Sequence, residues 1–285
     1  MKTVSHILLM FAASIACFAS RTVTDELGRT VSLPDHPRRM ICLVPSVADD
    51  LYALGAGSEV IAVSEFTKYP KEAALKPSIG VQLTPSIERI LSFHPDLLIG
   101  SADSNRVETV RQLEQVGIAV YMLNPHGIEG ILSSIASLGK AIGREDAANR
   151  LVSQLQGRLN AVRARVKDRP VVHVFMPIWY DPIITIGKNA FITEIIVAAG
   201  GKSITDDIIR EWPQISLETV IERKPDALVL VRSSRMSIKD VEGRPGWNTF
   251  SAIRDHHVYF VDERIELPSP GAFDALEDLA RQLHP

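Results

Sequence analysis

Residues 145–167 read EDAANRLVSQLQGRLNAVRARVK, and the rest of the chain is arranged around this stretch. Its apolar residues recur three or four positions apart, which is the spacing of one face of an α-helix. They are Ala147, Leu151, Leu155, Leu159, Val162 and Val166. At 1.5 Å per residue such a helix is roughly 35 Å long, and Pro170 favours its end. We predict one long amphipathic helix here.

The segments on either side of this helix follow one plan. SIERILSFHPDLLI stands at residues 86–99, and 130 positions later SLETVIERKPDALV stands at 216–229. Each copy predicts a helix, a Pro-Asp turn and a buried strand, and residues 117–121 and 256–260 match as second strands. A chance match of a common α/β phrase is the alternative. The favoured interpretation is two α/β lobes, at residues 20–144 and 169–285, joined by a bridging helix at 145–168.

The first 19 residues have the pattern of a secretory leader. One lysine precedes an uncharged run of ten residues, Ile7–Ala16, which is too short for a stable membrane anchor. Cleavage after Ala19 gives a soluble periplasmic product. Cleavage before Cys17 would give a lipoprotein, but Ser14 stands where that motif requires a branched apolar residue. We expect the soluble periplasmic form.

Composition excludes several classes of protein. The chain has 285 residues, of which 46% are hydrophobic, and this is enough for two lobes with cores of their own. The formal charge of -3 gives no reason to expect nucleic acid or an anionic membrane as a partner. The two cysteines are Cys17 in the leader and Cys42 in an apolar run, so no disulfide framework is expected and Cys42 is predicted to be buried and inert.

Local patterns predict further elements. Residues 21–33 alternate around a Glu-Leu-Gly turn and indicate a hairpin. Strand 40–44 ends in Pro45-Ser46, where Ser46 is placed to cap a helix that stops at Gly55. Helix 191–199 is predicted to end at Gly200-Gly201, and strands are predicted at 60–63 and 171–175.

Aromatic residues stand in the loops that follow predicted strands. Loops at the carboxyl ends of strands form the ligand crevice of open α/β sheets. If both lobes turn these loops to a shared cleft, aromatic residues of the two lobes face each other and fit a large, partly apolar ligand. Covering a lobe edge is the alternative role. The candidates are Phe66 and Tyr69 in the first lobe and Trp179, Tyr180 and Trp212 in the second, with Ser46 beside them.

These features together resemble the periplasmic substrate-binding proteins of ABC importers for cobalamin and ferric siderophores, and most of all the cobalamin-binding branch. The resemblance covers nearly all of the mature chain and is carried by the order and spacing of many short motifs. They include residues 23–31, 51–57, 86–88, 95–97, 198–201, 212–216 and 225–227. The resemblance implies two Rossmann-like lobes bridged by a rigid helix, with a corrinoid as transported ligand, no cofactor, and a monomer that meets a dimeric permease.

The resemblance also implies roles for single residues. Phe66 stands where the cobalamin-binding branch has a crevice tyrosine, Trp212 where it has a tryptophan, and Asp262 or Glu263 where an aspartate reaches the ligand. This sequence lacks further tryptophans around Gly80-Val81-Gln82 and at Ser101. A ferric siderophore or haem is therefore the alternative ligand.

Glu88 and Glu218 are equivalent in the two copies of the repeat. Each is predicted in the first turn of a helix, where a carboxylate is favoured by the helix dipole, and this is one explanation for both. The other is that two carboxylates related by a pseudo-twofold axis contact arginines on the two subunits of a permease, as the resemblance implies.

The sequence gives little reason to expect an enzyme. It has no Gly-x-Ser-x-Gly elbow, no phosphate-binding loop and no His-Glu-x-x-His helix. The adjacent His256 and His257 are predicted to point to opposite faces of a strand, so they cannot chelate one ion through neighbouring side chains. Capture of zinc or manganese is a third, weaker option.

Overall fold

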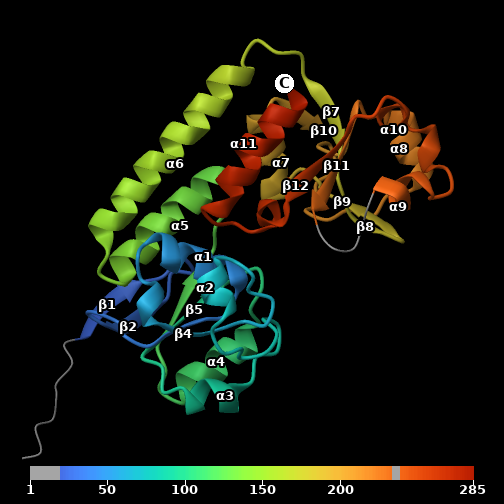
Figure 1. The fold of residues 1–285 in the computed structure, drawn as a ribbon. Coiled ribbons are helices and arrows are strands. Elements are labelled where there is room, and N and C mark those ends of the chain that lie inside the picture. The colour runs from blue at the N-terminus through green and yellow to red at the C-terminus, as the bar shows by residue number, and fades with distance from the viewer. Residues whose placement is uncertain (1–19, 233–237) are drawn as a thin grey trace, which may run out of the picture.

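The computed structural model describes residues 20–232 and 238–285 as two α/β lobes joined by one long helix, α6, as predicted (Figure 1). The predicted leader and its cleavage sites lie outside the described residues. The elements before α6 are β1 Ser20–Thr24, β2 Thr30–Pro34, β3 Met40–Cys42, α1 Pro45–Ala53, β4 Val60–Val63, α2 Lys71–Ala74, α3 Ile87–Ser92, β5 Leu97–Ser101, α4 Val107–Gln115, β6 Val120–Leu123 and α5 Gly127–Ala141. Those after it are β7 Val172–Phe175, β8 Pro177–Tyr180, β9 Ile183–Thr185, α7 Phe191–Ala198, β10 Gly201–Ser203, α8 Leu217–Arg223, β11 Ala227–Arg232, α9 Ile238–Glu242, α10 Ser251–Arg254, β12 Val258–Asp262 and α11 Gly271–Leu283, with the 3-10 helices η1 Gly57–Glu59, η2 Trp247–Thr249 and η3 Glu263–Glu266.

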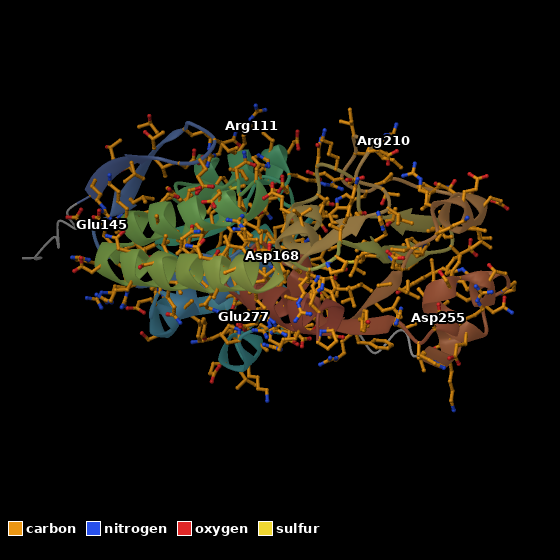
Figure 2. The ribbon with its side chains drawn as sticks, turned by 90° about the horizontal axis from the view of Figure 1, so that it is seen from above. Arg111, Glu145, Asp168, Arg210, Asp255 and Glu277 are labelled. Atoms are coloured by element: carbon orange, nitrogen blue, oxygen red, sulfur yellow. The ribbon has the colours of Figure 1, made fainter. Side chains whose placement is uncertain are left out.

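Helix α6 spans Glu145–Val166 and confirms the predicted bridging helix. Two acidic residues stand in its first turn and two arginines in its last, which suits the helix dipole. Its buried stripe includes Leu155, Leu159 and Val162, with Ala148 rather than the predicted Ala147 at its start. Figure 2 shows Glu145 and Asp168 marking the two ends of this helix.

The two sheets have the same parallel order, β4-β3-β5-β6 and β10-β7-β11-β12. The sequence repeat extends to atomic detail. Ser86 and Ser216 cap α3 and α8 through bonds of 3.2 Å from the backbone N–H three residues on. His94 and Lys224, 130 positions apart, both have positive φ, at 46° and 44°. This agreement in side chains, dihedral angles and strand order supports duplication over coincidence.

The aspartates of the two Pro-Asp turns fix the sheets. Asp96 accepts bonds of 2.7 and 3.0 Å from the backbone N–H groups of Arg38 and Arg39, just before β3. Asp226 accepts a bond of 2.8 Å from the N–H of His173 in β7. Each aspartate therefore ties the strand that follows it to the neighbouring strand.

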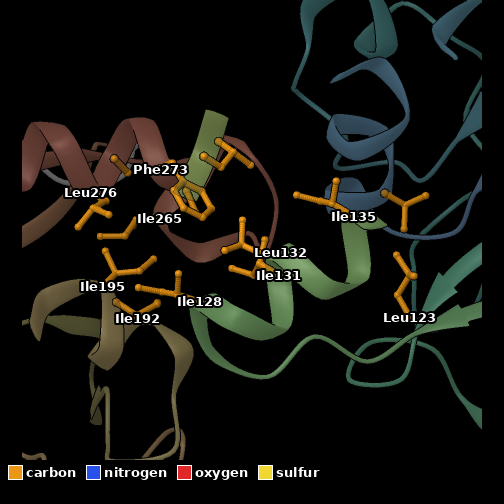
Figure 3. Packing of buried hydrophobic residues seen from close by; sticks show 14 of the residues in the cluster. Leu123, Ile128, Ile131, Leu132, Ile135, Ile192, Ile195, Ile265, Phe273 and Leu276 are labelled. Atoms are coloured by element: carbon orange, nitrogen blue, oxygen red, sulfur yellow. The ribbon is translucent and has the colours of Figure 1, made fainter. Parts of the chain in front are cut away.

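The largest apolar core runs through both lobes. Helix α5 of the first lobe packs against α6 and also against α7 of the second, and α11 packs against α6 and α7. Figure 3 shows this packing, in which Ile128 and Leu132 of α5 lie near Ile192 of α7 and Phe273 of α11. Burial of these side chains excludes water from the junction. The lobes are therefore connected by a shared core as well as by α6.

Two carboxylates also form hydrogen bonds from one lobe to the other. Each accepts from a backbone N–H group at the beginning of a helix in the opposite lobe. Asp49 of α1 accepts bonds of 2.7 Å from the hydroxyl of Ser269 and 2.9 Å from the backbone N–H of Gly271, where α11 begins. Glu194 of α7 accepts a bond of 2.9 Å from the backbone N–H of Ile128, where α5 begins. Helices α1 and α7 follow the equivalent strands β3 and β7, and α5 and α11 follow β6 and β12. The two contacts are thus related by the repeat, and we name them the interlobe caps.

Several local predictions are confirmed, and one is wrong. The hairpin β1–β2 forms, Gly55 and Gly200 end their helices at positive φ, and Cys42 is buried. Burial, followed by the nearby Asp50, raises the pKa of the Cys42 thiol, which keeps it protonated. Ser46, however, does not cap α1. The helix begins at Pro45, a favoured first helical residue, so Ser46 lies inside the first turn.

Candidate functional site

A crevice lies between the two lobes. Its deeper part is a cavity of about 260 Å³ formed by loops after β3, β5 and β6 of the first lobe and by loops around α7, α8 and η3 of the second. The lining residues are Val44, Pro45, Ser46, Gln82, Ser101, Asp103, Ser104, Pro125, His126, Gly127, Asn189, Ala190, Phe191, Glu211, Trp212, Glu266, Leu267 and Pro268. The loops of the first lobe come from the carboxyl ends of parallel strands, where ligands of open α/β sheets bind.

A second cavity of about 200 Å³ continues this crevice. Pro45, Glu266 and Leu267 line both cavities, so the two form one groove. Phe66, Lys68 and Tyr69 form the wall contributed by the loop after β4. Typical small-molecule sites occupy roughly 300–1,000 Å³, and the groove reaches that range only when both parts are taken together.

The structure brings four of the predicted residues to the groove. Trp212 lines the deeper part with 44% of its surface exposed, and Phe66 lines the outer part with 60% exposed. Tyr69 stands beside Phe66, and Ser46 lines the deeper part with 7% exposed. Large apolar side chains with so much free surface are suited to contact with a ligand.

Trp179 and Tyr180 occupy a different environment from the one predicted. They lie in β8, which pairs with β9 as a hairpin and not as a loop, and neither lines the two parts of the groove. Tyr180 packs 5.9 Å from the ring of Trp247 beneath the guanidinium of Arg244, and burial raises its pKa to about 12. The indole N–H of Trp179 donates to the backbone oxygen of Asp181. The expected meeting of these two rings with Phe66 and Tyr69 is therefore not seen in the groove.

Asp262 caps η3. Its carboxylate accepts bonds of 2.9 Å from the backbone N–H and the Nε of Arg264. Burial acts to raise the pKa of Asp262, but these bonds and the charge of Arg264 outweigh it, so the pKa is lowered. Asp262 is not among the lining residues of either part, whereas Glu263 and Glu266 are.

The loop that carries the first-lobe aromatics touches the second lobe directly. The ammonium of Lys68 lies 2.5 Å from a carboxylate oxygen of Glu263, and the guanidinium of Arg264 lies over the ring of Tyr69 at 5.2 Å. Both contacts join the loop after β4 to η3. They set the width of the outer part of the groove.

Carboxylates dominate the charge of the groove. Asp103 and Glu211 line the deeper part, and Glu266 lines both parts. Burial between the lobes, then the neighbouring Glu263, raises the pKa of Glu266, while Lys68 acts in the opposite direction. Sequence reasoning missed these three residues and Gln82. For Gln82 alone a signal was available in the 130-residue offset, because Gln82 and Trp212 are equivalent in the repeat and both line the groove.

The structure shows no metal centre within residues 20–232 and 238–285, since no group of three His, Cys, Asp or Glu side chains in these ranges could hold an ion. His256 and His257 do not form part of a strand, because β12 begins at Val258 and His256 has a positive φ of 60°. Within the same ranges, no helix has the length and apolar character needed to cross a bilayer.

Comparison with known proteins identifies the family. Residues 40–265, which include most of the chain and most of the residues that line the groove, match the family described as periplasmic binding protein. This chain is a periplasmic binding protein. It therefore belongs to a family of transport proteins that carry a ligand, which agrees with the expectation that it is not an enzyme.

Relatives of this periplasmic binding protein cover nearly its full length. An uncharacterized ABC transporter substrate-binding lipoprotein of Bacillus subtilis is 29% identical over 93% of this chain and 85% of its own length. A vitamin B12-binding protein of Vibrio parahaemolyticus is 28% identical over 87% of this chain and 90% of its own length.

Solved structures share the two-lobe fold. The periplasmic heme-binding protein of Roseiflexus sp. RS-1, in apo form, has a TM-score of 0.80 at 27% identity and covers 87% of this chain and 98% of its own. The vitamin B12-binding protein of Vibrio cholerae has a TM-score of 0.76 at 25% identity and covers 87% and 96%.

Glu88 and Glu218 lie away from the groove of this binding protein. Both are exposed in the first turns of α3 and α8, which stand at the outer parts of the two lobes in Figure 1. Bonds from the backbone N–H of Glu218 itself and from Ser216 lower the pKa of the Glu218 carboxyl, so it is ionised at neutral pH. Neither glutamate forms an ion pair with another described residue.

Proposed function

We propose that this protein captures a cobalamin-type corrinoid in the groove between its lobes and delivers it to an ABC permease. The observation that carries the proposal is a groove walled by both lobes, with the aromatic side chains of Phe66 and Tyr69 on one side and Trp212 on the other. Flat macrocycles have large apolar faces, and aromatic side chains contact such faces well. The vitamin B12-binding relatives support the choice of ligand.

The experiment is a test of retention. The purified protein is incubated separately with cobalamin, cobinamide, haem and a ferric siderophore, and each mixture is passed through a gel filtration column. We expect the visible band of a corrinoid to co-elute with the protein, and calorimetry to give one site. Absence of heat with every corrinoid, together with micromolar or tighter binding of another compound, would overturn the proposal.

Haem or a ferric siderophore is the second candidate. The observation that favours haem is the fold and 27% identity shared with the heme-binding protein of Roseiflexus. The same retention experiment separates the candidates, because corrinoids and haem have distinct visible spectra.

We further propose that the mature protein works as a monomer in the periplasm and meets a dimeric permease through Glu88 and Glu218. Their exposure, their equivalence in the repeat and their distance from the groove support this role. Two like-charged points on two lobes match a partner with two equivalent subunits. Mass spectrometry of the mature chain tests the predicted processing at Ala19 against lipidation at Cys17.

A further inference from the structure

The relatives include binders of vitamin B12 and of heme. The charge of the groove is the structural feature that can discriminate between these two ligands. Under the proposed function, on which this inference rests, a macrocycle occupies the groove. Corrinoids and haem have faces of comparable apolar character. Their edges differ, because the edge of a cobalamin-type corrin ring carries neutral amides, with the single phosphodiester of cobalamin held away from the ring on its nucleotide side chain, whereas haem carries two propionates at the ring edge.

Three carboxylates of the groove have no ion-pair partner among the described residues: Asp103, Glu211 and Glu266. They come from both lobes, from the loop after β5, the loop before α8 and the end of η3. Among residues 20–232 and 238–285, Lys68 is the one lysine that lines the groove, and it is already paired with Glu263 at 2.5 Å. No arginine of these ranges lines either part of the groove.

This arrangement opposes bound anions. A carboxylate on the ligand would lose water while facing like charges, and the described residues of the groove offer no free guanidinium or ammonium group to pair with it. Carboxylates are hydrogen-bond acceptors only, so they accept from the N–H groups of ligand amides. Placing unpaired charges against the wrong ligand is an established way to obtain specificity.

We infer that Asp103, Glu211 and Glu266 are specificity residues that admit a macrocycle edged with neutral amides and reject one edged with carboxylates. Within the family of possible cargoes this assigns the groove to amide-bearing corrinoids and excludes haem and small oxyanions.

The test compares two probes that share one ring. Dicyanocobinamide carries amides at the edge of its corrin, and dicyanocobyrinic acid carries carboxylates at the same positions. At low ionic strength we expect the wild-type protein to bind the amide probe at least tenfold more tightly, on the order of the effect of one close charge pair. Added salt should reduce this ratio.

Two triple variants test whether the preference for the amide probe comes from these three carboxylates. The triple change Asp103→Asn, Glu211→Gln and Glu266→Gln should bring the two affinities to within about threefold, mainly by strengthening the binding of the carboxylate probe. The control is Glu108→Gln, Glu222→Gln and Glu242→Gln, which removes the same charge from exposed sites outside the groove. Melting temperatures establish that both triple variants are folded.

The outcomes separate this inference from the proposed function. Equal affinity of the wild-type protein for both corrins, or an unchanged ratio in the folded triple variant, would overturn the inference while leaving corrinoid binding in place. If neither corrin binds, the proposed function fails. In that case haem and its diamide are compared to test whether the three carboxylates reject a ligand edged with carboxylates. Tighter binding of haem than of its diamide would overturn the inference.

Discussion

Trp212 is the residue with which the groove is best tested. It lies at the wall of the deeper part, and 44% of its surface is free to contact a ligand. Truncation of an aromatic side chain at the centre of a binding site costs about 2 kcal/mol or more of binding free energy. We therefore expect Trp212→Ala to weaken corrinoid binding by more than tenfold in calorimetry, with little change in melting temperature.

Ile209 provides the matched control for this change. It belongs to the same loop, is apolar and exposed at 74%, and does not line the groove. Ile209→Ala should leave corrinoid affinity unchanged. A Trp212→Ala variant with wild-type affinity and a markedly lower melting temperature would show that Trp212 only covers the lobe.

Asp50 makes the stability of the fold dependent on pH. It lies in α1 with 3% of its surface exposed, and one of its carboxylate oxygens has no hydrogen-bond partner. Burial, then Asp49 and Glu26, raise its pKa well above the ordinary value. A carboxyl group whose pKa is raised by folding contributes stability below its unfolded pKa, and this contribution is lost as pH rises through the folded pKa.

Asp50→Asn removes this titration. The free energy of unfolding of the variant, relative to wild type, should therefore increase from pH 4 toward pH 7. Urea denaturation at pH 4, 5.5 and 7 measures the difference. Parallel pH profiles for the two proteins would contradict the assignment of this ionisation to Asp50.

At the residue scale the sequence predicted the aromatic positions better than the charged ones. Phe66, Tyr69 and Trp212 reach the groove because they follow recognisable strands or precede a repeated element. No local sequence pattern marks Asp103 and Glu211 as groove residues. An acidic residue in a loop is predicted to be exposed to solvent, and its position in the groove follows only from the arrangement of both lobes. Tyr180 was misplaced because its environment depends on Trp247, which is distant in sequence.

At the scale of elements, the interlobe caps can be measured directly. Asp49 and Glu194 each accept bonds from the free N–H groups at the beginning of a helix in the other lobe. Replacing such a cap by alanine costs about 0.5–2 kcal/mol. We expect Asp49→Ala and Glu194→Ala each to lower the free energy of unfolding by about 1 kcal/mol, measured by urea denaturation.

The relative motion of the two lobes can be measured in the variant that lacks both interlobe caps. Fluorescence energy transfer between dyes on the two lobes should show a broader range of separations in the double variant, because both caps hold the same junction. Glu108→Ala, on the exposed face of α4, is the control for loss of a surface carboxylate. Unchanged stability and unchanged energy transfer would show that the caps do not restrain the lobes.

The long elements were readable from the sequence because their periodicity is local. The bridging helix, the repeated α3–β5 and α8–β11 pairs and the first hairpin all formed within a few residues of their predicted limits. The β8–β9 hairpin was missed, since Asp181-Pro182 separates two strands of three and four residues. The packing of α5 against the second lobe was also missed. An apolar helix face has the same sequence pattern whether it packs against its own lobe or against the other lobe.

At the scale of the whole molecule, the prediction concerns the permease. The double change Glu88→Ala and Glu218→Ala should reduce capture of the loaded protein by reconstituted permease and leave corrinoid affinity in solution unchanged. The reason is that both carboxylates are exposed and remote from the groove. Surface plasmon resonance measures capture, and calorimetry measures ligand binding.

A pair of exposed glutamates outside the two equivalent positions controls for the loss of two negative charges. Glu108→Ala with Glu222→Ala removes the same charge from α4 and α8. This variant should be captured more strongly than the Glu88 and Glu218 variant. Loss of corrinoid binding with intact capture would show that these two glutamates serve the ligand and not the permease.

The core shared by α5, α7 and α11 has a consequence for how the two halves can change over generations. Ile128 and Ile192 lie in the same apolar packing although 64 positions separate them, so a larger side chain at one is tolerated only if the other shrinks. Substitutions in the two halves are therefore expected to be coupled at the junction. Exposed groove residues such as Phe66 and Trp212 are not part of this packing and remain free to diverge, so a new cargo can be acquired while the scaffold is kept.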